Sequence, residues 1–76
     1  MMRLEELFAS VLQEPAATLS DGASPVTHRS WDSLRHIELV MAAEAAYGIR
    51  FETAEVTTIR TLGCMRELLQ QKGIAA

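Results

Sequence analysis

The segment WDSLRHIELVMAAEAAYGIRF, residues 31–51, decides the fold of this chain. Asp32 is a residue type that caps helix N-termini, because its side chain accepts a hydrogen bond from a free backbone N–H of the first turn. From Ser33 the residues suit a helix as far as Tyr47, and Gly48 then favours the left-handed conformation in which many helices end. The segment therefore predicts a helix over residues 33–47.

This predicted helix carries apolar residues on two of its faces. The stripe that suits the core of a small helical protein consists of Leu39, Val40, Ala43, Ala46 and Tyr47. A second stripe follows the spacing i, i+3, i+7 and consists of Leu34, Ile37 and Met41. A thin bundle cannot easily cover a helix on every side, so the second stripe predicts an exposed patch for a partner. The alternative is that Leu34 and Ile37 pack under a neighbouring loop.

Upstream of residue 31 the sequence predicts one helix and a long loop. Apolar residues with helical spacing indicate a first helix from about residue 2 to residue 13, before Pro15; they are Leu4, Leu7, Phe8, Val11 and Leu12. The stretch that follows, as far as Trp31, contains turn signals and no sustained period. We expect a long loop here, which Leu19 and Val26 pin to the core.

Downstream of residue 48 the signals are shorter. Ile49 and Phe51 are expected to plug a short connection, and residues 53–56 to form a single turn of helix. Thr61 caps a last helix that Gly73 ends, with an apolar face made of Leu62, Met65, Leu68 and Leu69. The predicted fold is all-α: a small bundle of three main helices with a short turn of helix before the last and a long loop between the first two.

Length and composition restrict the functions open to such a chain. Seventy-six residues form one small core, so we expect a single domain over residues 1–76. No apolar run approaches the ~20 residues of a membrane span, and a formal charge of −3 attracts phosphate backbones little, so neither membrane nor nucleic acid is an expected partner. Cys64 is the only cysteine, which excludes an internal disulfide and suits a reducing cytoplasm.

The residue types of catalytic and metal sites are present, but their spacing is unsuitable. Asp32, Ser33 and His36 fall within about one helical turn, where the carboxylate cannot orient the imidazole from its far side, so hydrolysis is not expected. His28, His36 and Cys64 lack the spacing of a zinc site, and no metal is expected. The glycines stand apart from one another and form no phosphate-binding loop.

Ser33 suggests a different chemistry, covalent modification by another enzyme. Its position in the first turn of a helix places the hydroxyl near free backbone N–H groups, which stabilise an attached phosphate. Nothing nearby activates the hydroxyl, so a second enzyme would have to modify it. The alternative is that Ser33 is only an N-terminal helix residue.

The chain resembles the acyl and peptidyl carrier proteins, whose Asp-Ser-Leu motif bears a 4'-phosphopantetheine arm. The matching stretches are Trp31-Asp32-Ser33-Leu34, Ile37-Glu38-Leu39-Val40-Met41-Ala42 and Tyr47-Gly48-Ile49-Arg50-Phe51. An amphipathic first helix, a long loop and a last helix from Thr61 extend the resemblance over nearly the whole chain.

The resemblance implies a role for each residue of the motif. Ser33 would be the attachment serine and Asp32 its preceding acid. The residues facing partner proteins would be Leu34, Ile37 and Met41, with Glu38 and Glu55 among the acidic contacts. The chain would be a free-standing, monomeric acyl carrier protein, not an enzyme, which holds an acyl group as a thioester on the arm.

The resemblance also implies the partners of the chain. They would be a phosphopantetheinyl transferase, which attaches the arm from coenzyme A, a loading enzyme (an acyltransferase or an adenylating ligase), and downstream biosynthetic enzymes. Two alternatives stay open: a peptidyl or aminoacyl carrier loaded by an adenylating enzyme, and a helical interaction module that never carries an arm.

Two departures from the fatty-acid carriers point to specialised metabolism. Those carriers usually have a small residue where Trp31 stands, and their second helix is strongly acidic, whereas residues 33–60 here hold four acids and three arginines. A Trp-Asp-Ser-Leu start resembles the discrete carriers of polyketide and related pathways. We expect the Trp31 ring to pack on the bundle rather than against the arm.

Overall fold

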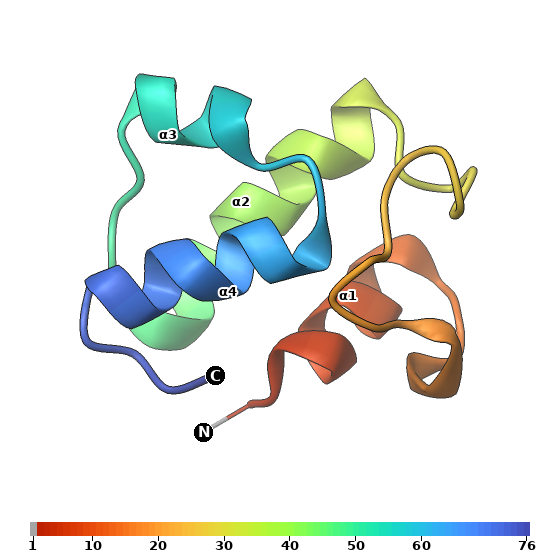
Figure 1. The fold of residues 1–76 in the computed structure, drawn as a ribbon, viewed down its shortest axis with the longest axis horizontal. Coiled ribbons are helices and arrows are strands. Elements are labelled where there is room, and N and C mark those ends of the chain that lie inside the picture. The colour runs from red at the N-terminus through yellow and green to blue at the C-terminus, as the bar shows by residue number, and fades with distance from the viewer. Residues whose placement is uncertain (1) are drawn as a thin grey trace.

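The computed structural model describes residues 2–76, and these residues fold as helices without strands (Figure 1). Their order is α1 (Leu4–Leu12), a 3-10 turn η1 (Ala16–Thr18), α2 (Ser33–Tyr47), α3 (Thr53–Thr58) and α4 (Leu62–Gln71). The all-α prediction is confirmed. None of the helices in this part of the chain is long and apolar enough to cross a lipid bilayer.

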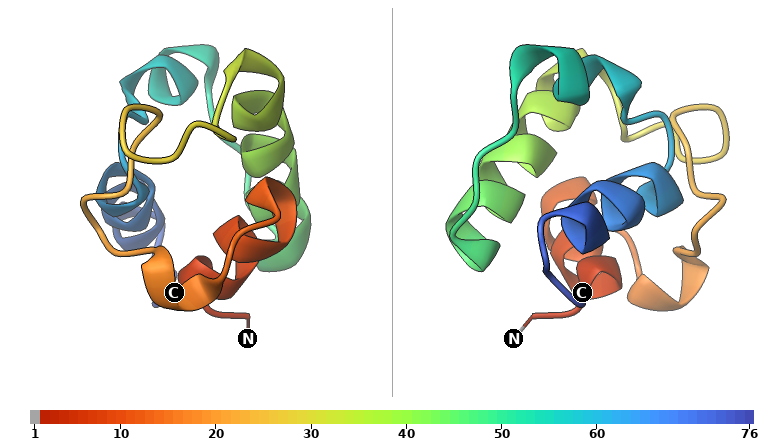
Figure 2. Two further views of the ribbon diagram at one scale, coloured as in Figure 1. Left: turned by 90° about the vertical axis from the view of Figure 1, so that its right-hand side faces the viewer. Right: turned by 60° about the vertical axis from the view of Figure 1, so that its left-hand side comes forward.

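The helices enclose one core, and α3 lies at the end of the molecule opposite to both termini (Figures 1 and 2). Helix α1 packs on both α2 and α4. The hydroxyl of Tyr47, at the end of α2, donates a hydrogen bond of 2.7 Å to the carbonyl of Met2. This bond holds the start of the chain against the far end of α2.

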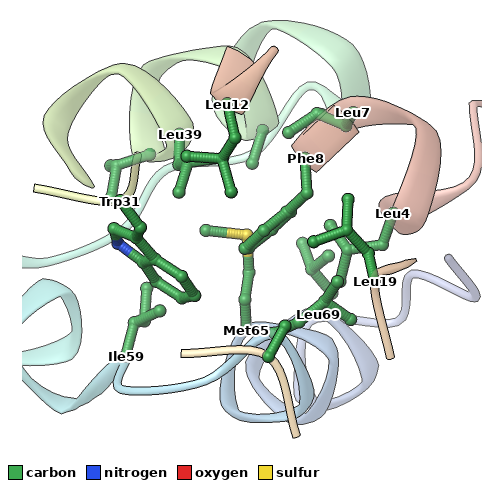
Figure 3. Packing of buried hydrophobic residues seen from close by; sticks show 14 of the residues in the cluster. Leu4, Leu7, Phe8, Leu12, Leu19, Trp31, Leu39, Ile59, Met65 and Leu69 are labelled. Carbon is green, nitrogen blue, oxygen red and sulfur yellow. The ribbon is translucent and has the colours of Figure 1, made fainter. Parts of the chain in front are cut away.

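The core is apolar, and no polar or charged residue among residues 2–76 is buried in it. Helix α1 contributes Leu4, Leu7, Phe8 and Leu12, while α4 contributes Leu62, Met65 and Leu69. Figure 3 shows Met65 reaching from α4 to the middle of the cluster, next to Phe8. Removing each large side chain from water contributes about 1.5–3 kcal/mol to the stability of the fold.

The caps of α2 are as the sequence predicted. Asp32 Oδ1 accepts a hydrogen bond of 2.9 Å from the Arg35 N–H, and Gly48 adopts a left-handed φ of 64°.

One member of the predicted core stripe of α2 is wrong, because Ala46 is exposed. The buried face of α2 is centred between Leu39 and Val40, and Ala46 lies at its edge in the last turn.

The boundaries of the shorter helices differ from the prediction. Helix α1 begins at Leu4 and ends at Leu12, because Gln13 adopts a left-handed φ of 59° and closes the helix before Pro15. Helix α3 continues beyond the predicted single turn to Thr58. Thr61 caps α4 as predicted, with its hydroxyl oxygen accepting from the Cys64 N–H at 3.0 Å, and Gly73 is left-handed just after α4.

The long loop is attached to the core at Leu19, as predicted, but the prediction for Val26 is wrong. Leu19 is buried, but Val26 is 86% exposed, and Ala23 takes the buried place instead. The first N–H groups of α4 explain the difference: Leu62 donates to the carbonyl of Ala23 at 3.0 Å, and Gly63 to that of Asp21 at 2.9 Å. These bonds draw Ala23 inward, because the free donors of a helix start need partners.

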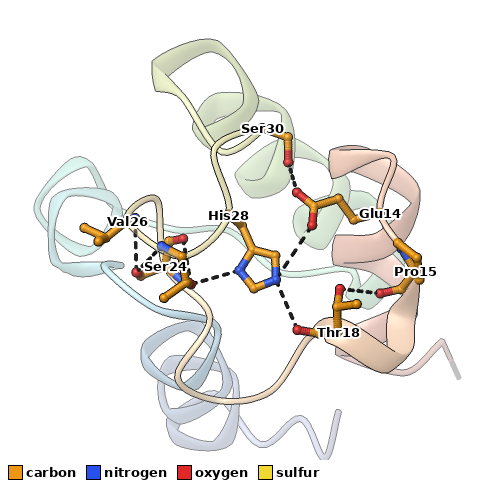
Figure 4. Close-up of polar contacts among 8 residues, drawn as sticks. Glu14, Pro15, Thr18, Ser24, Val26, His28 and Ser30 are labelled. Atoms are coloured by element: carbon orange, nitrogen blue, oxygen red, sulfur yellow. Dashed lines mark hydrogen bonds and ion pairs between the residues drawn. The ribbon is translucent and has the colours of Figure 1, made fainter.

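Polar contacts hold the rest of the loop (Figure 4). The His28 ring lies 3.1 Å from the carbonyl of Thr18 through Nε2 and 2.9 Å from the Thr27 hydroxyl through Nδ1. Glu14 accepts a hydrogen bond from Ser30 and also approaches His28 Nε2 at 3.7 Å. These contacts fix the loop just before Trp31 and so position the start of α2.

Candidate functional site

Ser33 is the first residue of α2 and is exposed. The Asp32 carboxylate accepts a hydrogen bond from the Arg35 N–H, and the Asp32 carbonyl accepts the first hydrogen bond of the helix, from the His36 N–H, at 2.9 Å. The N–H groups of Ser33 and Leu34 make no intrahelical bond, because they lie in the first turn and no helical carbonyl precedes them by four residues. The Ser33 hydroxyl therefore stands beside two free backbone donors at the positive end of a helix dipole.

A shallow groove of about 550 Å³ lies beside Ser33. The long loop, α2 and α3 line it with Pro25, Trp31, His36, Ile37, Val56 and Thr57, together with Asp32 and Ser33. Its surface is mainly apolar apart from the residues at the helix start. Sequence reasoning missed Pro25, Val56 and Thr57, because no local pattern shows that the loop and α3 meet at this place.

Trp31 closes the inner side of this groove. Its ring is 2% exposed and packs edge-on against Phe8, with ring centroids 5.3 Å apart. The prediction that Trp31 packs on the bundle is confirmed. The indole Nε1 donates a hydrogen bond of 3.0 Å to His36 Nδ1, so the one polar atom of the ring is satisfied.

His36 connects α2 to α3. Its Nε2 lies 3.0 Å from the carbonyl oxygen of Val56, which only accepts hydrogen bonds, so Nε2 carries the proton. Nδ1 then accepts from Trp31, and both ring nitrogens are occupied. His36 is therefore not available as a base for Ser33, and the Asp32, Ser33 and His36 grouping does not have the geometry of a hydrolase.

The second stripe of α2 is on the surface. Leu34 is 67% exposed, Ile37 50% and Met41 62%, whereas Leu39 on the opposite face is fully buried. The alternative in which Leu34 and Ile37 pack under the loop is wrong, because the loop is tied to α4 and leaves them uncovered. We call Leu34, Ile37 and Met41 the outer stripe.

The two predicted acidic contacts both have partners inside the molecule. Glu38 Oε1 lies 3.6 Å from Arg35 Nε, one turn back along α2. Glu55 in α3 accepts a hydrogen bond from the Glu52 N–H at 2.9 Å and bonds from Lys72 Nζ at 3.0 and 3.2 Å. The Glu52 N–H, followed by the Lys72 ammonium, lowers the pKa of the Glu55 carboxyl.

The histidines and the cysteine are held in separate places. His28 lies within the long loop and contacts the Thr18 carbonyl, His36 bridges α2 and α3, and Cys64 in α4 accepts a hydrogen bond from the Thr61 hydroxyl at 3.2 Å. Within residues 2–76 no group of three or more His, Cys, Asp or Glu side chains is placed to hold a metal ion. The chemistry open to the site is therefore that of the exposed Ser33 hydroxyl.

The chain was compared with family models and with known proteins, and the two relatives given below belong to one class of protein. No family model matches the chain. The chain is 37% identical over 70 residues to polyketide-8 synthase acyl carrier protein 2 of Streptomyces avermitilis, which covers 92% of this chain and 80% of that protein. It is 35% identical over 66 residues to an acyl carrier protein of Saccharopolyspora erythraea, covering 87% and 70%.

A solved structure with the same fold comes from a third organism. The solution NMR structure of a holo acyl carrier protein from Geobacter metallireducens superposes with a TM-score of 0.82. The sequences are 28% identical, and the match covers 91% of this chain and 79% of the other. Both the helical arrangement and the sequence are thus similar to those of the same class of protein.

Proposed function

Because the chain belongs to the acyl carrier protein family, whose cofactor is a covalently attached 4'-phosphopantetheine arm, we propose that this arm is joined to Ser33. The protein is a carrier and not a catalyst. The observation that supports Ser33 best is its exposed hydroxyl in the first turn of α2, directly after the capping Asp32 and beside the groove. Asp32 positions the serine by fixing the start of the helix.

The residues around Ser33 fit a phosphate-linked group. The unpaired N–H groups of Ser33 and Leu34 and the α2 dipole favour a negative charge at this position by about 0.3–1 kcal/mol. Trp31 and His36 close the interior behind the serine and leave the hydroxyl open to solvent. When bound, the arm supplies a thiol on which the acyl group is held as a thioester.

We propose polyketide biosynthesis as the pathway. The Streptomyces avermitilis relative is named for a polyketide synthase. The presence of Trp31 before the Asp-Ser-Leu motif and the mixed charge of residues 33–60 agree with this choice. An aminoacyl cargo loaded by an adenylating enzyme is the alternative. The cytoplasmic location stays a prediction.

The outer stripe is the proposed docking face for partner enzymes. A phosphopantetheinyl transferase, a loading enzyme and downstream biosynthetic enzymes must all reach Ser33, and the outer stripe begins beside it at Leu34. Exposed apolar side chains near the centre of an interface carry most of its binding energy. Glu38 and Glu55 lie in α2 and α3 around this face, with their charges shared with Arg35 and Lys72.

Intact mass spectrometry tests the attachment site. The purified chain is incubated with coenzyme A, Mg²⁺ and a broad-specificity phosphopantetheinyl transferase, and we expect a mass gain of one phosphopantetheinyl group. Ser33→Ala should gain nothing, while the matched control Ser20→Ala, at an exposed loop serine, should gain the full group. An equal gain on Ser33→Ala would contradict the assignment, and no gain on the unaltered chain would favour an interaction module without an arm.

A further inference from the structure

The carboxylates around the outer stripe are largely engaged inside the molecule. Glu38 faces Arg35, Glu55 faces Lys72, and Glu44 Oε2 accepts a hydrogen bond of 2.9 Å from the Phe51 N–H. Asp32 and Glu52 are the N-cap residues of α2 and α3, where the positive end of each helix dipole stabilises their negative charge. A basic partner that binds these carboxylates would have to compete with the intramolecular ion pairs and hydrogen bonds that they already make.

Two arginines near the outer stripe are in the opposite situation. Arg50 and Arg60 are exposed, and neither takes part in an ion pair or a side-chain hydrogen bond within the described residues. Both guanidinium groups can therefore bind a carboxylate from another molecule without giving up a contact. Arginine suits that task, because its planar group makes two parallel hydrogen bonds to a carboxylate.

The two arginines lie toward opposite ends of the outer stripe. Arg50 shares a surface depression with Met41, the last residue of the stripe. Arg60 lines a groove between the loop and α3, and that groove shares Pro25, His36, Val56 and Thr57 with the groove beside Ser33 and Ile37. The apolar stripe thus runs between two available positive charges.

We propose that the enzymes docking on this face present an apolar surface flanked by carboxylates, which pair with Arg50 and Arg60. This inference rests on the proposed function, because it names the chemistry of the partner that reaches Ser33. The outer stripe contributes the apolar contact, and the two arginines at the rim select the partner and speed its association. A strongly basic docking surface would place like charges against both arginines.

Two synthetic amphipathic helical peptides serve as probes. They share one stripe of leucines, and the flanking residues are Glu in one peptide and Lys in the other. Each is titrated into the ¹⁵N-labelled chain, and backbone amide shifts report the site and the affinity. We expect the Glu peptide to shift Ile37, Met41, Arg50 and Arg60, and to bind about fivefold or more tightly than the Lys peptide, with the difference falling as salt rises.

Charge reversal of the two arginines is the decisive variant. In Arg50→Glu/Arg60→Glu we expect the preference to change to the Lys peptide. A control at a distant site, Arg3→Glu, changes an exposed arginine at the start of α1 and should keep the Glu preference. Circular dichroism confirms that each variant is folded.

Three results would overturn the proposal: equal binding of the two peptides, binding of neither, or shifts away from the outer stripe. Arm attachment is measured separately by intact mass. A chain that binds the Glu peptide but takes no arm would retain this inference about the surface and reject the proposed function.

Discussion

Leu39 and Leu34 belong to the same helix, yet Leu39 is fully buried and Leu34 is 67% exposed. Leu39 lies on the face of α2 that α1 covers, together with Val40, Ala43 and Tyr47. Leu34 lies on the outer stripe, to which no other element contributes a covering layer in residues 2–76. The comparison shows that an apolar stripe does not determine its own burial, because burial depends on which helices pack over it.

The two faces also differ in what holds their surroundings in place. The inner face is packed against apolar side chains from α1 and α4. On the other side, α3 contributes no buried residue, and polar contacts tie it down: His36 to the Val56 carbonyl and Lys72 to Glu55. The inner face therefore supports stability, while the outer side is free to change its contacts when a partner binds.

The largest expected effect comes from Trp31, which joins the core to the start of α2. Trp31→Ala should lower the free energy of unfolding by about 3–5 kcal/mol, because it removes a buried ring that packs on Phe8. Urea denaturation measures this change. Trp31→Phe keeps most of the ring contact and should lose less. A Trp31→Ala variant as stable as the parent would show that the ring is not part of the core.

The second prediction compares the same substitution on both faces of α2. Leu39→Ala should cost about 2–5 kcal/mol of unfolding free energy, because it leaves a cavity in the core. Leu34→Ala should change it by no more than about 0.5 kcal/mol, as surface substitutions usually do. Melting curves of the two variants check the contrast, and a similar loss for both would mean that the outer stripe is covered in solution.

The third prediction concerns His36, which lies between the two faces. His36→Leu should cost about 1–3 kcal/mol, because it leaves the Trp31 N–H and the Val56 carbonyl without their partner. Hydrogen exchange should quicken in α3 more than in α4. The control is His36→Gln, whose amide offers both a donor and an acceptor and should restore part of the loss. Unchanged protection of α3 in His36→Leu would show that this bridge does not hold the helix.

The fourth prediction tests the outer stripe by its effect on the transferase reaction. Ile37→Ala and Met41→Ala should leave the melting temperature nearly unchanged and slow arm attachment severalfold, as expected when an interface anchor worth about 1 kcal/mol or more is truncated. The rate is measured by intact mass over time at equal protein concentration. Normal attachment per folded molecule together with lower stability would contradict the docking role of these residues.

The smallest expected effect is a dependence of the stability of the fold on pH, caused by the Glu55 carboxyl. The folded pKa lies below the ordinary value of 4.5, so the contacts of the ionised carboxylate stabilise the fold above that value and are lost as the pH falls through the lowered pKa. Glu55→Gln should therefore be less stable than the parent at neutral pH, and the difference should shrink in acid. Thermal melts across this range measure it. A constant difference at all pH values would assign the loss to packing instead of charge.

The sequence predicted best the features that neighbouring residues control. The boundaries of α2 were correct because Asp32 and Gly48 act within one turn of the helix ends. The errors concern features that depend on distant segments. Val26 is exposed because the N–H groups of α4 draw in Ala23 instead, and Ala46 is exposed because the buried face of α2 has a different centre.

The candidate site divides in the same way. Ser33, Asp32 and the outer stripe were visible as a local motif and a helical spacing. The groove, the link from Trp31 through His36 to Val56, and the pairing of Glu55 with Lys72 were not, since each joins residues on different elements. No periodicity within one helix reports which carbonyl or ammonium group a neighbouring element will bring to it.

By itself, the sequence determined the positions of the main helices, the exposed serine at a helix start and the excess of apolar surface on α2, because caps and periodicity are properties of short stretches of chain. Only the tertiary structure decided which apolar face stays uncovered, how Trp31 and His36 close the interior behind Ser33, and which charges remain available. Those outcomes depend on where α1, α3 and α4 come to rest against α2, and that arrangement is set by the packing of the whole core.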